Sequence, residues 1–385
     1  MRKLLAALTL LALIFTGCAK DEGRTTVSDL CVFSQTSEGT PMKTMLSTGK
    51  RTAVCIDPLC DHGEDCPLYS CGEWLVCGDE FIFVKGSLSL DRNTGERSGY
   101  IDLLAYNMTN GGVTQLDRRE DSLILLGAFE RYVFFSAAER DDADRSVFRV
   151  FRADLKSRKV VTLPLGGFRS DDNDLADSSP RVWTIADRRI YWYAPGEDGY
   201  EYFTTDLAGK NKQTLESGEP SLMNGVYKDG FAYFTERVSE KAFSECISQL
   251  ERLKWINEKR LCRVDLSTGE KTIISENAAD YIVTDDGIFF VSVEKEPRGF
   301  TKNGETYYDL FGGKVYYSDG VTTGLFSELE YDLSADTFAG ARDGYLALRF
   351  MEDLPNNYYA GGYEYNTSDR FIIIGTRDGV FRLSD

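Results

Sequence analysis

The residues best able to do chemistry are cysteines and the only histidine of the chain, gathered in one short segment. These residues are Cys55, Cys60, His62, Cys66, Cys71 and Cys77. Thiolate and imidazole groups at Cys55, Cys60, His62 and Cys66 can supply a tetrahedral zinc site, which would be structural because all four positions would be filled. Residues 55–77 are therefore predicted to be a cysteine-rich connection with structural zinc as the candidate cofactor.

The N-terminus has the organisation of a bacterial export signal. Met1-Arg2-Lys3 is basic, residues 4–15 are apolar, and Thr16-Gly17-Cys18 ends the segment with small residues and a cysteine that resemble the lipobox of bacterial lipoproteins. The apolar stretch is shorter than the roughly 20 residues that span a bilayer. We predict a signal peptide over residues 1–17, lipid attachment at Cys18 and a polar tether over 18–27. The mature chain is expected to be extracytoplasmic, on the cell surface or the periplasmic face, and to contact the membrane through the lipid anchor only.

Disulfides are the competing interpretation of the cysteine-rich segment. The chain has 9 cysteines, and an even number is left once the lipidated Cys18 is set aside. An even number in an exported chain favours disulfides, each of which stabilises a domain by about 2–4 kcal/mol, whereas the histidine inside the segment favours a metal. Disulfides, metal and free reactive thiols all stay open at this point. Elsewhere, Cys246 and Cys262 are a candidate disulfide.

Composition and charge exclude several classes of protein. Asp and Glu number 62 against 44 Lys and Arg, a formal charge of −18, so nucleic acid would be repelled. A single histidine excludes most metallohydrolases and Ser-His-Asp hydrolases, which need imidazole as a ligand or base. The sequence also contains no nucleophile elbow, phosphate loop or dinucleotide-binding motif.

Short aromatic strands recur along the whole chain and predict the fold. They occupy residues 31–34, 82–84, 133–136, 190–193, 232–235, 288–291 and 346–348. Their spacing suits one four-stranded blade each, so we predict an all-β chain with a β-propeller of seven blades over residues 28–385. Polar turns around Asn107, Asp154, Asp206, Asp265 and Asn366 follow these strands and predict the outer hairpins, because Asp and Asn side chains cap tight turns.

Two features depart from the repeat. Apolar residues recur at helical spacing between 239 and 259, which predicts an inserted amphipathic helix, and we expect its apolar face to cover the propeller rather than a partner. The first unit lacks an initial strand, while residues 379–383 offer a surplus one. We predict that this C-terminal strand joins the first blade and closes the propeller.

Tyr191-Trp192 and Tyr233-Phe234-Thr235-Glu236 resemble the Tyr-Trp-Thr-Asp strand of low-density-lipoprotein-receptor-type propellers. The mature chain resembles bacterial surface lipoproteins that carry such a propeller, or the related TolB-type propeller, mostly described as domains of unknown function. The Pro58-to-Pro67 segment resembles a Pro-Leu-Cys-x-His-x-x-x-Cys-Pro stretch of the same lipoproteins. This resemblance implies fold and location more than activity.

Two classes of function follow as expectations. The first is a non-catalytic binding module of the cell envelope, whose partner is an envelope protein or an extracellular glycan or peptide. The alternative is a polysaccharide-active lyase or hydrolase that uses acidic and tyrosine side chains of the propeller channel, which rests on analogy of fold alone. The sequence favours the module without chemistry and leaves catalytic residues unassigned.

Overall fold

The structure is a computed structural model, and it describes residues 26–36, 39–86, 89–90, 97–120, 122–140, 146–166, 168–169, 180–186, 188–196, 199–214, 225–239, 241–265, 268, 270–302, 305–350, 357–359, 362–364 and 370–384. The predicted signal peptide, Cys18, almost all of the tether and the predicted turn at Asn366 lie outside the described residues. Among the helices that are described, none is long and apolar enough to cross a membrane.

The chain is a β-propeller of seven antiparallel blades, as predicted. The first four blades contain β1 (Cys31–Gln35), β2 (Pro41–Met45) and β3 (Arg51–Ala53); β4 (Trp74–Cys77), β5 (Glu80–Gly86), β8 (Ile101–Asn107) and β9 (Val113–Arg119); β10 (Leu123–Phe129), β11 (Tyr132–Arg140), β12 (Ser146–Asp154) and β13 (Lys159–Thr162), with β14 (Phe168–Arg169) beside β12; and β15 (Arg181–Ala186), β16 (Arg189–Gly196), β17 (Gly199–Asp206) and β18 (Gln213–Thr214).

The last three blades contain β19 (Val226–Lys228), β20 (Phe231–Arg237), β21 (Lys259–Asp265) and β22 (Lys271–Ser275); β23 (Asp280–Val283), β24 (Ile288–Val291), β27 (Lys314–Ser318) and β28 (Thr323–Glu328); and β29 (Leu333–Arg342), β30 (Tyr345–Phe350), β33 (Ile372–Gly375) and β34 (Phe381–Leu383). Short hairpins extend blades two, six and seven between their second and third strands. They are β6 (Ser89–Leu90) with β7 (Arg97–Ser98), β25 (Arg298–Lys302) with β26 (Glu305–Asp309), and β31 (Asn357–Tyr359) with β32 (Gly362–Glu364).

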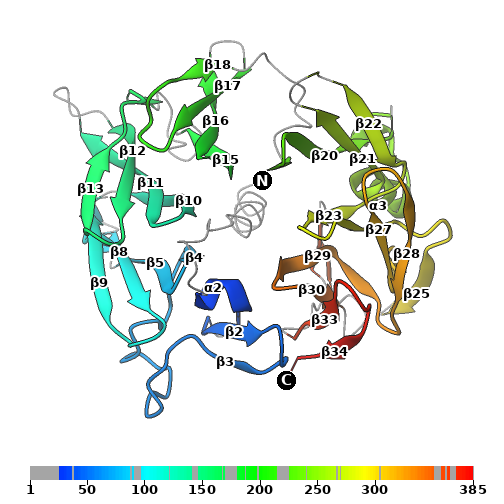
Figure 1. Ribbon diagram of the computed structural model, residues 1–385, viewed down its shortest axis with the longest axis horizontal. Coiled ribbons are helices and arrows are strands. Elements are labelled where there is room, and N and C mark those ends of the chain that lie inside the picture. Colours follow the sequence, from blue (N-terminus) through cyan, green and yellow to red (C-terminus); the bar gives the residue numbers. More distant parts are fainter. Residues whose placement is uncertain are drawn as a thin grey trace. The chain divides into compact units, whose positions relative to one another are not determined.

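Two compact units divide the chain. The first contains residues 1–30, 34–43 and 52–218, and the second contains 31–33, 44–51 and 219–385. In Figure 1 the first unit can be followed from β4 to β18 and the second from β20 to β34.

The predicted aromatic strands are confirmed, and each is the second strand of a four-stranded blade or the first strand of blade one. These strands are apolar at successive positions because both of their faces are covered, as β11 of the first unit shows. On β11, Phe134 packs with Trp192 of blade four, whereas its neighbour Phe135 packs with Leu103 of blade two. Both phenylalanines are fully buried, since successive residues of a strand point to opposite faces and both faces are covered.

The predicted closure by the C-terminal strand is wrong. Blade one has three strands among the described residues, and β34 pairs with β33 of its own blade, with Ile372 opposite Leu383. A short hairpin forms this pair, because the Gly379 amide donates to the Gly375 carbonyl at 3.0 Å. Closing so short a turn costs less chain entropy than pairing with the distant first blade, so β34 pairs with β33 and completes blade seven. Val32 of blade one still packs with Ile373 of blade seven in one apolar cluster.

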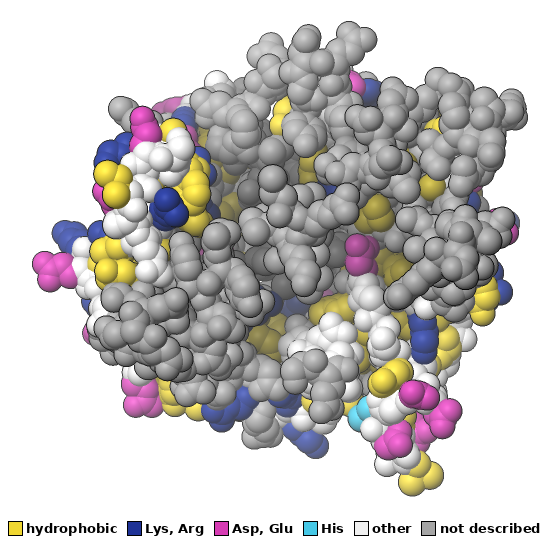
Figure 2. Space-filling model, turned by 180° about the vertical axis from the view of Figure 1, so that it is seen from behind, with side chains coloured by type: hydrophobic (Ala, Val, Ile, Leu, Met, Phe, Trp, Pro, Cys, Tyr) yellow, Lys and Arg dark blue, Asp and Glu magenta, His cyan; other side chains and the backbone are white. Residues whose placement is uncertain are grey.

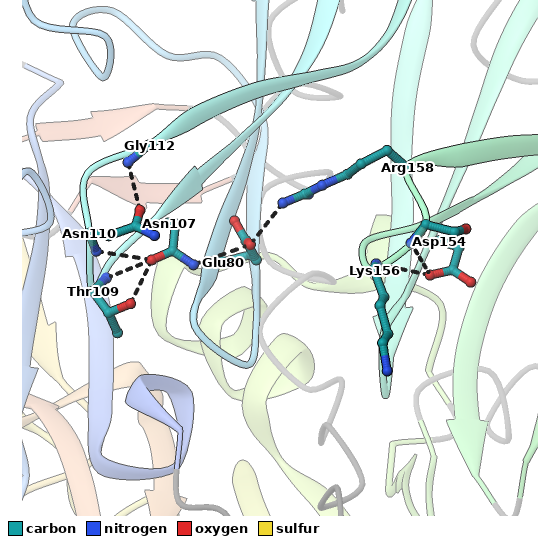
Figure 3. A network of polar contacts seen from close by, with 9 residues as sticks. Glu80, Asn107, Thr109, Asn110, Gly112, Asp154, Lys156 and Arg158 are labelled. Atoms are coloured by element: carbon teal, nitrogen blue, oxygen red, sulfur yellow. Dashed lines mark hydrogen bonds and ion pairs between the residues drawn. The ribbon is translucent and has the colours of Figure 1, made fainter.

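The polar turns of the outer hairpins form as predicted at the described positions. The Asn107 side-chain oxygen accepts the amides of Thr109 at 3.1 Å and Asn110 at 3.0 Å (Figure 3). The Asp154 carboxylate accepts the Lys156 amide at 2.9 Å in the next blade (Figure 3). Each cap satisfies turn amides that have no strand partner.

One carboxylate links these two turns. Glu80 Oε1 accepts the Asn107 side-chain amide at 3.3 Å within blade two and the Arg158 guanidinium at 3.2 Å from blade three (Figure 3). Arg158 itself has a left-handed backbone conformation, with φ 56°. The outer turns therefore hold adjacent blades of the first unit in register.

The inserted helix is shorter than predicted. The range 239–259 contains a 3-10 turn, η2 (Phe243–Glu245), and the nine-residue helix α3 (Gln249–Asn257). Ser248 begins the helix because its side chain accepts the Glu251 amide and the Glu251 carboxylate accepts the Ser248 amide, which is a capping box. Residues before Ser248 are therefore outside the helix, and Ile247 is 91% exposed. Leu253 packs into the apolar core of the second unit, as expected for a helix that covers the propeller.

Candidate metal centre

The connection between β3 and β4 contains no strand and folds through a series of tight turns. The Asp57 carboxylate accepts the Leu59 amide at 2.9 Å, and the Asp61 carboxylate accepts the Gly63 amide at 2.9 Å. Both contacts are Asx turns, in which a side chain replaces the backbone acceptor of a turn. Residues 55–66, which we name the metal loop, are folded back on themselves by these turns.

The four predicted donors of the metal loop converge. One ligand atom each from Cys55, Cys60, His62 and Cys66 lies within 4.8 Å of the other three. Cys66 Sγ and His62 Nδ1 are 4.0 Å apart. In a tetrahedral zinc site with bonds of about 2.3 Å to sulfur, ligand atoms are separated by about 3.8 Å. The donor set and its geometry therefore fit zinc after a small contraction.

Local backbone contacts orient two of these donors. The His62 amide lies 3.4 Å from Cys60 Sγ and donates to it. His62 has left-handed backbone, φ 59°, which turns the chain between the second and the fourth donor. The Cys66 amide donates to the Gly63 carbonyl at 2.9 Å. These contacts shorten the path along the chain enough for four donors within twelve residues to face one point.

One thiol of the cluster, Cys66, stays protonated in the absence of a cation. The pKa of the Cys66 thiol is raised to about 12, chiefly by burial and to a smaller extent by the neighbouring Cys60 and Cys55 thiols. A bound divalent cation reverses this balance, because it coordinates the thiolate and displaces the proton. Metal binding to this cluster would therefore release protons and strengthen as the pH rises.

The other cysteines of the segment lie outside the cluster. Cys71 is buried, its Sγ lies 3.8 Å from Gln35 Nε2, and burial raises the pKa of its thiol to about 11. Cys77 lies on β4 and donates to the Glu130 carbonyl at 2.8 Å. The candidate centre is thus limited to three cysteines and one histidine.

No disulfide joins the cysteines that the structure describes, so the predicted disulfides are absent from it. The Cys246–Cys262 pair fails for a local reason. Cys246 Sγ points back to the Ala242 carbonyl at 3.9 Å, and Cys262 is fixed on β21 opposite Phe234. Burial, followed by the nearby Glu236 carboxylate, raises the pKa of the Cys262 thiol to about 12.

Sequence reasoning missed one residue at the metal loop. The Tyr106 hydroxyl accepts the Ile56 amide, next to Cys55, at 2.8 Å. Burial raises the pKa of Tyr106 to about 12, and the Cys55 thiol adds to the effect. Tyr106 lies 50 residues from Ile56 in an apolar strand, so no local pattern distinguishes it from a core tyrosine.

The outer end of the metal loop is exposed and acidic. The Leu59 side chain is 93% exposed and Ile56 is 38% exposed. Four exposed carboxylates surround them, at Asp57, Asp61, Glu64 and Asp65. Figure 2 shows hydrophobic and acidic side chains gathered at one corner together with the histidine. Residues 52–84 contain no Lys or Arg, so the sequence supplies no basic neighbour within this segment.

Comparisons with known proteins bear on the fold and not on the metal loop. No protein-family model and no curated protein matches the sequence. A solved prolyl endopeptidase is 11% identical with a TM-score of 0.50, and the match covers 93% of this chain and 50% of that one. The likeness is one of fold.

Two further solved structures are similar at lower scores. TolB from Acinetobacter baumannii is 11% identical with a TM-score of 0.40, over 76% of this chain and 62% of that chain. The β-propeller domain of the Trilobed protease from Pyrococcus furiosus is 12% identical with a TM-score of 0.43, over 81% and 93%. This chain therefore spans 62% of TolB and half of the endopeptidase.

Proposed function

We propose that this chain is a lipid-anchored, extracytoplasmic β-propeller that binds an envelope protein through a zinc-stabilised metal loop. The observation that carries the proposal is the convergence of Cys55, Cys60, His62 and Cys66 in a loop that also contains an exposed leucine. Zinc with four protein ligands has no open position for substrate, so its role here is structural. A closed zinc site would stabilise a loop that has no strand of its own.

The outer end of the metal loop supplies the contact surface. Leu59 is 93% exposed, whereas Cys66 and Leu68 of the same connection are 3% and 1% exposed. A fixed loop loses little conformational entropy on binding, so an exposed aliphatic side chain on it is an efficient anchor. The surrounding carboxylates favour a partner with a basic surface and an apolar pocket.

Location follows from the N-terminal sequence. The basic start, the apolar stretch over residues 4–15 and Thr16-Gly17-Cys18 support export and lipidation at Cys18. The net charge of −18 disfavours binding to an anionic membrane surface, so the lipid alone would anchor the chain.

Within the described residues no observation favours the polysaccharide-active alternative. Glu73 is the described carboxylate whose pKa is raised, and burial is the cause. Its Oε2 accepts the Leu125 amide at 3.0 Å, a contact that joins the residue before β4 of blade two to β10 of blade three. A structural contact therefore explains the perturbed carboxylate.

Metal content tests the zinc part of the proposal. Native mass spectrometry of the reduced, exported chain should find one zinc ion per molecule. Cys60→Ser and His62→Ala should each lose the ion, whereas Cys71→Ser should keep it because Cys71 lies outside the cluster. A wild-type chain that stays metal-free in the presence of zinc would overturn this part.

Site-specific cross-linking tests the binding part. A photo-reactive amino acid in place of Leu59 should capture one basic envelope protein in the native membrane, and chelation of zinc should abolish the capture. The matched control is the same group in place of Val321, which is 88% exposed and lies in the second unit. Equal capture from both positions, or none from position 59, would refute a docking role, and glycan binding without protein capture would favour a glycan ligand.

A further inference from the structure

The insertion between β20 and β21 contains an aromatic pair with cations around it. The rings of Trp255, on α3, and Phe243, in the 3-10 turn, have centroids 4.9 Å apart. The guanidinium carbon of Arg237 lies 3.4 Å from the centroid of the Trp255 ring, and that of Arg252 lies 5.9 Å from the centroid of the Phe243 ring. The Trp255 indole donates to the Lys241 carbonyl at 2.7 Å. We name this surface the insertion patch, and it consists of Arg237, Lys241, Phe243, Ile247, Arg252 and Trp255.

The insertion patch also exposes apolar side chains. Ile247 is 91% exposed and Phe243 is 39% exposed. Hydrogen bonds hold the backbone at Ile247, since its amide donates to the Glu251 carboxylate at 2.9 Å and Arg252 Nε donates to the neighbouring Cys246 carbonyl at 3.1 Å. The insertion therefore covers the propeller with the inner side of its helix and presents a fixed apolar surface outside that helix.

The charge of the insertion patch is opposite to the net charge of −18 of the chain. Its three cations form no ion pair with any carboxylate that the structure describes. Arg237 also lies opposite Lys259 of β21, and like charges at directly opposed strand positions repel each other. Glu245 and Glu251 are already engaged, because each accepts backbone amides of the insertion, at 2.8 Å and 2.9 Å. The patch therefore favours a negatively charged partner.

The stacked guanidinium of Arg237 keeps its hydrogen-bonding edge available. Stacking uses the flat face of a guanidinium, whereas its five N–H donors lie in its plane and point outward. A carboxylate can accept two of these donors side by side. The hydrogen bond from Trp255 to Lys241 fixes the ring below, so Arg237 loses little conformational entropy when it binds a carboxylate.

We propose that the insertion patch binds an acidic segment of a partner protein, with Arg237 pairing a carboxylate and Ile247 and Phe243 contacting an apolar side chain. A polypeptide is favoured over a sugar because Arg237 covers the indole and Phe243 packs against it, so the ring surface on which a sugar would stack is in use. The inference does not depend on zinc, since the patch lies in the second unit and the metal loop lies in the first.

Selection from a phage-displayed library of random short peptides tests the inference on the full chain. The wild type should select peptides that contain more acidic than basic residues together with an aliphatic or aromatic residue. The affinity of a selected peptide, measured by fluorescence anisotropy, should fall about 10- to 100-fold in Arg237→Gln, because a charge-assisted pair is lost. Arg237→Lys should bind with intermediate affinity, since it keeps the charge and loses the planar fork.

Arg382→Gln is the matched control. Arg382 is exposed in the same unit, and its guanidinium carbon lies 5.3 Å from the centroid of the Tyr345 ring, so the variant also removes a stacked arginine. It should bind the peptide as the wild type does. Ile247→Ala should weaken binding about tenfold, because Ile247 supplies apolar contact area. Raising the sodium chloride concentration should weaken binding to the wild type, since exposed charges are screened.

Three outcomes would overturn the inference. The first is that no acidic peptide is selected, and the second is that Arg237→Gln and Arg382→Gln bind a selected peptide equally well. If Arg237→Gln does not fold, unchanged affinity in Ile247→Ala has the same meaning. The third is that the patch takes another occupant, shown by binding of polygalacturonate in place of peptides or by a dimer of this chain that Arg237→Gln abolishes. Zinc content tests the metal loop separately, because Cys60→Ser should leave peptide binding unchanged.

Discussion

Two cysteine-containing segments of this protein reach opposite results. In the metal loop of the first unit, three thiols and an imidazole face one point. In the insertion of the second unit, Cys246 and Cys262 are both buried, yet each has its own surroundings. The difference shows that the number and spacing of cysteines do not decide whether they meet.

Regular secondary structure accounts for the difference. The metal loop has no strand or helix, so Asx turns at Asp57 and Asp61 can fold it tightly. In the insertion, helix α3 lies between the two cysteines in the sequence, and Cys262 lies on strand β21. These two elements set the positions of the cysteines. Where backbone hydrogen bonds of helices and strands fix the path of the chain, they also fix whether two cysteines come close enough to react.

The largest expected effect comes from the ligands of the metal loop. Cys60→Ser should abolish stoichiometric zinc binding, whereas Cys262→Ser should leave it intact, as measured by metal analysis. Zinc at a thousandfold excess over its Kd stabilises the folded state by about 4 kcal/mol, so urea unfolding should show about that loss in Cys60→Ser. Equal zinc content in the two variants would break the comparison.

The next effect concerns the packing of the insertion. Leu253→Ala should lower the free energy of unfolding by about 2–5 kcal/mol, because Leu253 is 4% exposed and packs with Val293 and Leu310. Ile247→Ala is the control, since Ile247 is 91% exposed and its loss should change stability by less than about 0.5 kcal/mol. Similar losses in both variants would show that the segment is packed as one longer helix.

A smaller effect tests where the helix begins. Ser248→Ala removes the side chain that accepts the Glu251 amide, and should cost about 1 kcal/mol in urea unfolding. Ser239→Ala is the control, because Ser239 lies before the capped helix. A larger loss from Ser239→Ala would contradict a helix that starts after Ser248.

The smallest expected effect is a pH dependence of the free energy of unfolding that comes from Glu73, at the end of the connection that contains the metal loop. Burial raises the pKa of Glu73 in the folded chain above its ordinary value of 4.5. The folded state then binds the Glu73 proton more tightly than the unfolded state. The resulting stabilisation of the folded state is fully present below about pH 4.5 and is lost as the pH rises through the folded pKa.

Glu73→Gln should remove that dependence while its amide oxygen still accepts the Leu125 amide. Unfolding measured from pH 4 to 8 should therefore show the wild type losing stability relative to Glu73→Gln as the pH rises. A difference between the two proteins that is constant over this range would contradict a raised pKa of Glu73.

Local sequence patterns predicted much of the architecture. The aromatic strands, the side-chain caps of the outer turns and the missing strand of blade one all follow from neighbouring residues. The predictions that failed required a choice between partners. The C-terminal strand had two possible neighbours, and hairpin geometry decided between them. The helix was predicted from residue 239, and the Ser248 capping box makes it begin later.

The sequence by itself determined a β-propeller with seven repeats and named the four donors of the metal loop among several alternatives. Lipidation at Cys18 stays a prediction. Only the tertiary structure decided that these donors converge, that Cys246 and Cys262 do not pair, and that the Tyr106 hydroxyl accepts the Ile56 amide of the metal loop. The reason is physical: side-chain alternation and turn chemistry depend on adjacent residues, whereas the meeting of distant side chains depends on how complete blades pack.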